Sequence, residues 1–295
     1  MIAQNERDTM TTITSPLPVL DREQSSIART HRGRAFATLA RRRMLLSART
    51  PREILVPLLT PILFASVIAP ALAKTAHAVR GIDYQSYVAL GTVGLLLPIS
   101  CMFAGIGVIV DRQQGAQRDL LSAPVPRSLL VFGNLAVALL ICALQLGALI
   151  FVAALRGADF QTTLTGIGWF AVAAVLLSVT MYGAAEALAS RIDKQEEYIG
   201  AVPAIAIVPW FVAGSLFPIS SLPWFLAAVA KVLPLTHALA LMRYGLVDHH
   251  ASGLGEIWGH HDPSLMAAAS LAVLIVYAAA LTAVSVRVFT RAAVR

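Results

Sequence analysis

The chain contains few charged residues. Only 13% of its 295 residues are Asp, Glu, Lys or Arg, against about 25% in soluble domains, and 57% are hydrophobic. This composition excludes an ordinary soluble enzyme and indicates a membrane protein. The formal charge of +7 would suggest nucleic-acid binding only if the basic residues gathered on a soluble face. Because they border apolar segments instead, we expect contact with anionic lipids and no nucleic-acid partner.

The chain also has only two cysteines and lacks the signatures of several catalytic classes. Cys101 and Cys142 lie in apolar segments, where cysteine packs as a small hydrophobic residue, so no disulfide framework is expected. No Gly-x-x-x-x-Gly-Lys-Ser/Thr loop occurs, so the chain itself is not expected to bind ATP phosphates or another cofactor. The Gly-x-Ser-x-Gly nucleophile motif is missing as well, and we expect no catalytic residues.

One polar segment near the C-terminus is rich in histidine. It holds His249, His250, His260, His261 and Asp262. Their spacing matches no standard zinc-ligand pattern, so the sequence predicts a solvated loop and no metal site.

Long uncharged segments dominate the rest of the sequence. Six of them are close to the roughly 20 residues that a helix needs to cross a bilayer. They show no alternation of polar and apolar residues, and backbone groups in hydrocarbon must be paired within the segment, so we predict helices. The fold class is therefore an all-α polytopic membrane protein, with spans at residues 54–73, 88–110, 128–155, 166–188, 199–219 and 265–286.

The basic residues predict how these spans are oriented. Lys and Arg concentrate in the segments on one side of the six spans, which places that side in the cytoplasm. The exceptions among the 23 are Lys74, Arg80, Arg156, Lys231 and Arg243. We therefore expect a multi-pass protein of the plasma (inner) membrane with both termini cytoplasmic.

The N-terminal part divides into two regions before the first span. Residues 1–25 are polar, lack an apolar period and read as a disordered cytoplasmic tail. Residues 26–50 mix arginines with apolar residues, which is typical of an interfacial amphipathic helix, and Pro51 ends it. Residues 51–295 form the predicted transmembrane domain.

Two segments between spans stand out. The predicted cytoplasmic loop at 111–127 has a charged helical part, stopped by Pro124 and Pro126, that could transmit force from a soluble partner. The second segment follows the fifth predicted span, where two apolar pieces too short to cross a bilayer flank Pro234. This pattern predicts a re-entrant helical hairpin in the outer leaflet, with Trp224 at headgroup level and with Arg243 and His237 as anchors there.

The two segments resemble one family. The loop is similar to the Glu/Asp-x-x-x-Gly pattern after the second span of ABC-2-type export permeases. The run from Gly214 through Pro218 and Pro234 to Arg243 resembles that family's C-terminal signature, particularly in its daunorubicin-resistance branch. Asp111 stands where many members have Glu, and Ala116 where many have Thr.

The resemblance implies a function and two protein partners. It implies the membrane-spanning permease of an ATP-binding cassette exporter for amphipathic drugs or complex envelope lipids. ATP and Mg²⁺ would bind a separate ATPase subunit, and a second permease chain, identical or homologous, would complete the path. It further implies an ATPase-coupling loop with Asp111, Arg112, Gly115, Arg118 and Asp119. The implied outer hairpin contains Gly214, Phe217, Pro218, Pro223, Trp224, Pro234 and Arg243.

Two polar residues lie within predicted spans. Glu186 is an intramembrane acid near the cytoplasmic end of its span, where pairing, contact with water or a role in a transport pathway are all open. Gln145 lies mid-span and suits hydrogen bonding between helices or a pathway role. The alternative function is a stand-alone secondary carrier or channel for a hydrophobic solute, which would need further intramembrane charges or broken helices in both halves.

Overall fold

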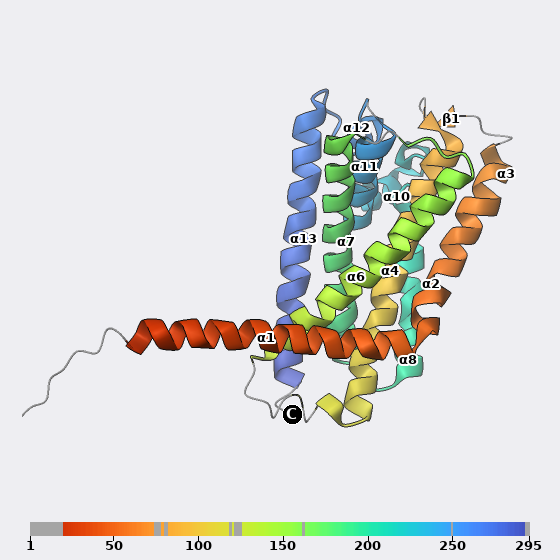
Figure 1. Ribbon diagram of the computed structural model, residues 1–295. Coiled ribbons are helices and arrows are strands. Elements are labelled where there is room, and N and C mark those ends of the chain that lie inside the picture. Colours follow the sequence, from red (N-terminus) through yellow and green to blue (C-terminus); the bar gives the residue numbers. More distant parts are fainter. Residues whose placement is uncertain are drawn as a thin grey trace, which may run out of the picture.

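A bundle of long helices is crossed at one end by a helix that lies outside it (Figure 1). The computed structural model describes residues 20–73, 78–79, 82–117, 120, 126–160, 163–248 and 250–292. Strand structure in this part of the chain consists of two two-residue strands, β1 (Ala78–Val79) and β2 (Ile82–Asp83). They pair antiparallel, with Ala78 opposite Asp83 and Val79 opposite Ile82. The predicted helical fold class is confirmed.

Four helices are each long and apolar enough to cross a membrane. They contain the predicted second, third, fourth and sixth spans and extend a few residues beyond them. Asp83 caps the first of the four by accepting a hydrogen bond from the Ser86 amide, and Thr163 caps the third through the Gly166 amide. The four are α4 (Tyr84–Gln113), α6 (Arg127–Leu155), α7 (Leu164–Ala189) and α13 (Pro263–Ala292).

The first and fifth predicted spans are helical but interrupted by π-helical turns. At the first, α2 (Pro51–Leu63) leads through a π-turn at Phe64–Ile68 into α3 (Ala69–Ala73). At the fifth, α8 (Gln195–Val202) leads through a π-turn at Pro203–Ile207 into α9 (Val208–Val212). The predicted end of the fifth span at residue 219 was wrong, because Gly214 adopts a φ of +78° that ends helical structure although the sequence stays apolar. The count of six spans stays a prediction.

The segment after α9 forms two short helices with a sharp bend between them. The helices α10 (Trp224–Val232) and α11 (Pro234–Leu246) follow a 3₁₀ turn at Ile219–Ser221 and meet at 79°. Pro234 occupies the first turn of α11, where a missing amide proton costs nothing. A bend at this proline agrees with the expected pair of short helices, while its re-entrant position in the outer leaflet stays a prediction. The chain continues through α12 (Ser252–Trp258) into α13.

The N-terminal helix α1 (Leu20–Arg49) lies across the end of the bundle where α4 and α13 terminate (Figure 1). This placement suits the predicted interfacial helix. It begins six residues before the predicted start at residue 26, so the predicted tail at 1–25 was too long. No proline or glycine occurs between Leu20 and His31 to stop the helix earlier. Residues 1–19 lie outside the described part of the chain.

The core is built around α4, which is the most buried of the four long helices. Close backbone approach between other helices depends on glycine. A Cβ atom on Gly166 of α7 would collide with the Gly245 carbonyl of α11, and one on Gly245 would collide with the Gly166 carbonyl. In a membrane, where burial of apolar surface does not drive helices together, such close packing is a main source of helix association.

Candidate functional site

The end of α4 nearest α1 carries the first residue of the predicted coupling loop. Arg42 of α1 binds the Asp111 carboxylate through both terminal nitrogens, at 3.0 Å from Nη2 to Oδ1 and 3.4 Å from Nη1 to Oδ2. Asp111 is buried. A two-pronged contact of this kind fixes orientation as well as distance. Asp111 therefore connects α4 to α1 and does not form a free docking surface.

The next two residues of α4, Arg112 and Gln113, contact the segment that connects α7 to α8. Arg112 donates to the Ser190 carbonyl at 3.4 Å and to the Ile192 carbonyl, and its Nη2 lies 3.3 Å from the exposed Asp193 carboxylate. Gln113 donates to the Asp193 carbonyl at 3.0 Å. Carbonyls that follow a helix end have no partner within the helix, and these side chains supply one. The end of α4 is thus bound on both sides.

Beyond these contacts the chain makes a turn at Gly115. Gly115 has a φ of +78°, and a Cβ atom built there would meet nothing within 4 Å. Its surroundings are therefore open, while its backbone conformation favours glycine. The predicted loop residues Arg118 and Asp119 lie outside the described residues. The structure brings Asp111, Arg112 and Gly115 together at one end of the bundle.

A second arginine of α1 penetrates the bundle. Arg43 is 8% exposed and donates from Nη2 to the Ala104 carbonyl of α4 at 3.1 Å. Its guanidinium occupies the space over Gly107, where any side chain would collide with it. Arg42, Arg43 and Asp193 were not among the predicted site residues. The excess of arginine in α1 was the available signal, but a sequence of adjacent arginines does not show which of them face inward.

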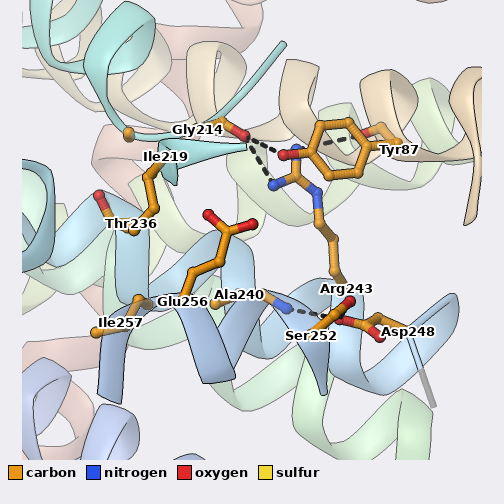
Figure 2. Close-up of a pocket in the computed structure, with 12 residues that line it drawn as sticks. Tyr87, Gly214, Ile219, Thr236, Ala240, Arg243, Asp248, Ser252, Glu256 and Ile257 are labelled. Carbon is orange, nitrogen blue, oxygen red and sulfur yellow. Dashed lines mark hydrogen bonds between the residues drawn. The ribbon is translucent and has the colours of Figure 1, made fainter. Parts of the chain in front are cut away.

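The opposite end of the bundle holds a buried arginine from the predicted hairpin (Figure 2). Arg243 of α11 donates to the carbonyls of Gly214 at 2.8 Å, Ser215 at 2.9 Å and Tyr87 at 3.2 Å. Its guanidinium carbon lies 3.5 Å from the centre of the Tyr87 ring, and the Tyr87 hydroxyl also donates to the Gly214 carbonyl at 2.9 Å. Arg243 therefore holds the turn after α9 against α4 and α11.

This geometry corrects the expectation that Arg243 and His237 anchor the hairpin at headgroups. Arg243 is 5% exposed and His237 is 2% exposed. His237 contacts the Ser270 hydroxyl at 3.2 Å and the Lys231 carbonyl at 3.0 Å. Both side chains reach inward because turns and helix ends leave carbonyls that need donors. The cavity beside Arg243 has about 30 Å³, which suits a water molecule and not a transported substrate.

The other predicted hairpin residues do not gather at one point. Gly214 is bound to Arg243, and Pro234 is buried at the start of α11. Pro218 and Pro223 precede the short helices at Ile219 and Trp224. Phe217 is 38% exposed and Trp224 is 83% exposed, which agrees with contact between these rings and the membrane.

The two polar residues within spans are both buried. Glu186 has no exposed surface and accepts a hydrogen bond from the Ser285 hydroxyl of α13 at 2.9 Å. Which of the expected alternatives applies to Glu186, pairing, contact with water or a pathway role, stays a prediction. Gln145 is 2% exposed on α6. A role of Gln145 or Glu186 in a transport pathway stays a prediction.

The histidine-rich segment borders an open hollow of about 420 Å³ beside α12. His250, His260 and His261 line it together with Glu256. Among the described residues, no group of three or more His, Cys, Asp or Glu side chains has an arrangement that could hold a metal ion. His249 lies outside the described residues.

Comparison with known proteins assigns the fold to a family. Residues 34–247 match the ABC-2 type transporter family. The chain is also similar to Nodulation protein J of Sinorhizobium fredii (strain NBRC 101917 / NGR234), with 26% identity over 180 residues, which cover 60% of this chain and 67% of that protein. The membrane components of this family are transport permeases, and a separate subunit hydrolyses ATP. With its membrane-spanning helices and a family match over most of its length, the chain is a multi-pass membrane protein that belongs to the ABC-2 type transporter family.

Proposed function

We propose that the chain is the membrane-spanning permease subunit of an ATP-binding cassette exporter. A separate ATPase subunit would bind ATP and Mg²⁺ and dock at the turn after α4. A second permease chain, identical or homologous, would complete the transport path. Family membership supports this assignment, and the positions of α1 and the α4 turn at one end of the bundle support the place of docking.

The observation that carries the proposal is the way the end of α4 is held. Arg42 joins it to α1, and Arg112 joins it to the connection between α7 and α8. A push on the turn at Gly115 would therefore reach α1 and the connection between α7 and α8 at the same time. Because α4 is also the most buried of the long helices, its displacement would alter packing throughout the bundle. This is what a coupling element needs in order to bias the bundle between two conformations.

The substrate class follows from what the spans contain. The described spans carry few ionisable side chains, and Glu186 is buried and bound to Ser285 of α13. A hydrophilic solute would find few partners along such helices. Amphipathic drugs or complex envelope lipids suit them better, and export is the direction that resemblance to the daunorubicin-resistance branch implies. The inner membrane, with both termini in the cytoplasm, is the proposed location.

The test compares two glycines with the same backbone constraint at opposite ends of the bundle. Gly115 and Gly259 have φ values of +78° and +69°, and a Cβ atom on either would meet nothing within 4 Å. Alanine at a left-handed position costs about 1–2 kcal/mol, which is roughly a 5- to 30-fold change in an equilibrium constant. Tagged wild-type, Gly115→Ala and Gly259→Ala chains would be purified in mild detergent, and the amount and activity of co-purifying ATPase measured.

We expect a near-stoichiometric ATPase with the wild type and with Gly259→Ala, and at least a 5-fold loss of bound or active ATPase with Gly115→Ala. Equal behaviour of the two variants would refute docking at the α4 turn. If no ATPase co-purifies even after crosslinking, the exporter assignment fails and the stand-alone carrier gains support. A second six-span chain in the purified complex would decide between a homodimer and a heterodimer.

A further inference from the structure

A long apolar groove separates α6 from α7 over part of their length. One face of α6 forms the first wall, one face of α7 forms the second, and Leu97 of α4 lies at the bottom. The groove is open and has a volume of about 370 Å³. The α6 wall comprises Leu139, Cys142, Ala143, Leu146, Gly147 and Ile150, and the α7 wall comprises Ile167, Phe170, Ala171, Ala174, Val175 and Ser178.

Small residues leave this space open. Gly147 and Ala143 on α6 face the groove, and Ala171 and Ala174 do so on α7. A Cβ atom built on Gly147 would meet nothing within 4 Å. Small residues usually allow two membrane helices to touch. Here the two walls stand apart although their helices are consecutive in the chain.

The dimensions of the groove fit one hydrocarbon chain. From Leu139 to Ile150 the helix rises about 16 Å, which is close to half of the ~30 Å hydrocarbon thickness of a bilayer. The groove is thus about as long as the hydrocarbon chains of one leaflet.

The chemistry and surroundings of the groove point to the same occupant. Its polar groups are the Ser178 hydroxyl and the Cys142 thiol, and Cys142 Sγ lies 3.8 Å from Cys101 Sγ inside the bundle. Water would find too few hydrogen-bonding partners to fill such a space. Val175 of the α7 wall is 50% exposed and Leu144, which lies on α6 outside the groove lining, is 66% exposed to the surroundings, which for these spans is lipid. The groove is therefore continuous with the lipid-facing surface.

We propose that this groove is a binding site for a single acyl chain of a bilayer phospholipid. The chain lies between α6 and α7, extends from mid-membrane toward the end where these helices are joined, and fills space that no side chain occupies. This site requires only that the protein be embedded in a membrane, so it is independent of the proposed ATPase coupling.

The experiment uses the full chain in phosphatidylglycerol vesicles that contain a minor fraction of phospholipid with a photoreactive diazirine at the middle of one chain. After irradiation, mass spectrometry locates the labelled residues. Gly147→Phe places a ring in the groove. Gly168→Phe is the matched control, because Gly168 is exposed on α7, is equally open around its Cβ position and does not line the groove. Ala171→Phe fills the groove from the opposite wall, in case the first variant folds poorly.

We expect labelling of the α6 and α7 walls in the wild type, at least a 5-fold loss in Gly147→Phe and Ala171→Phe, and no loss in Gly168→Phe. Native mass spectrometry should show one retained phospholipid per chain in the wild type and in the control. Undiminished wall labelling in both groove-filling variants would overturn the proposal, as would an equal loss in the control. Crosslinking experiments that place a helix of a second copy in the groove would also overturn it.

Discussion

Replacing Arg42 should destabilise the protein more than replacing its partner Asp111. The Arg42 side chain is 34% exposed and can turn toward water, whereas the Asp111 side chain is 13% exposed and cannot. Arg42→Gln leaves a nearly buried carboxylate without its two hydrogen bonds, which costs about 2 kcal/mol. Asp111→Asn leaves an arginine that water can solvate, and the cost falls to about 1 kcal/mol.

The assay is equilibrium unfolding in mixed micelles, with Arg41→Gln as the control. Arg41 is the exposed neighbour of Arg42 in α1, and its replacement should leave the free energy of unfolding unchanged within error. The double variant Arg42→Gln, Asp111→Asn should cost no more than Arg42→Gln alone, because the unpaired charge has gone. A larger cost for Asp111→Asn than for Arg42→Gln, or strict additivity in the double variant, would refute this account of the contact.

Three further predictions concern the helix contacts. Arg243→Lys should lower the free energy of unfolding by about 2 kcal/mol, because a single ammonium group cannot replace a planar guanidinium that reaches three carbonyls. Thermal denaturation measures this loss, and a negligible shift would contradict the role of the guanidinium. Gly245→Ala should lower the free energy of unfolding by about 2 kcal/mol or more, because it forces α11 away from α7. Gly255→Ala, where the added methyl group meets open space, should raise it by about 0.5 kcal/mol. Similar values for both variants would argue against close backbone packing. Glu186→Gln retains an acceptor for Ser285 and should change the free energy of unfolding by less than about 1 kcal/mol, whereas Glu186→Leu should cost more. Denaturation curves measure both values, and a larger cost for Glu186→Gln would contradict this reasoning.

The long helices were predictable from sequence because hydrocarbon permits few alternatives for a backbone. The segments 88–110 and 265–286 appear within α4 and α13, and each helix continues past its apolar part until a turn or the end of the described chain. The prediction failed where an apolar segment is not helical. The residues from 213 to 219 remain mostly apolar, but the left-handed conformation of Gly214 ends the helix before them. An apolar sequence therefore shows burial in the membrane more reliably than it shows where a helix stops.

The sequence marked some residues at the two ends of the bundle but not the contacts that they make. The glycines and prolines of the hairpin marked a turn, and Asp111 and Arg112 marked the end of α4. Nothing in the sequence showed that Arg42 rather than Arg41 meets Asp111, since both lie in the same row of arginines and one position on a helix turns a side chain by about 100°. Likewise, Ser285 is an ordinary serine in an apolar segment until α7 and α13 bring it to Glu186.

Several arginines act as structural connectors in this chain. Arg43, Arg112, Arg127 and Arg243 each donate to main-chain carbonyls of an element distant in sequence. Most of these acceptors follow a helix end or a turn, where carbonyls lack partners in the helix. A guanidinium has five donors and stays charged when buried, so it can satisfy several such groups from one side chain.

The same reasoning separates two kinds of arginine in the chain. Exposed ones such as Arg34 and Arg41 contribute charge alone, and lysine should replace them without loss. The connectors need the planar geometry, so their replacement by lysine preserves the charge pattern from which the orientation of the spans is predicted but weakens the contacts between elements. The predicted topology and the contacts between helices therefore depend on different properties of one residue type, and the Arg-to-Lys exchange distinguishes them. Insertion should survive the exchange at both kinds of position, whereas stability should fall only at the connectors.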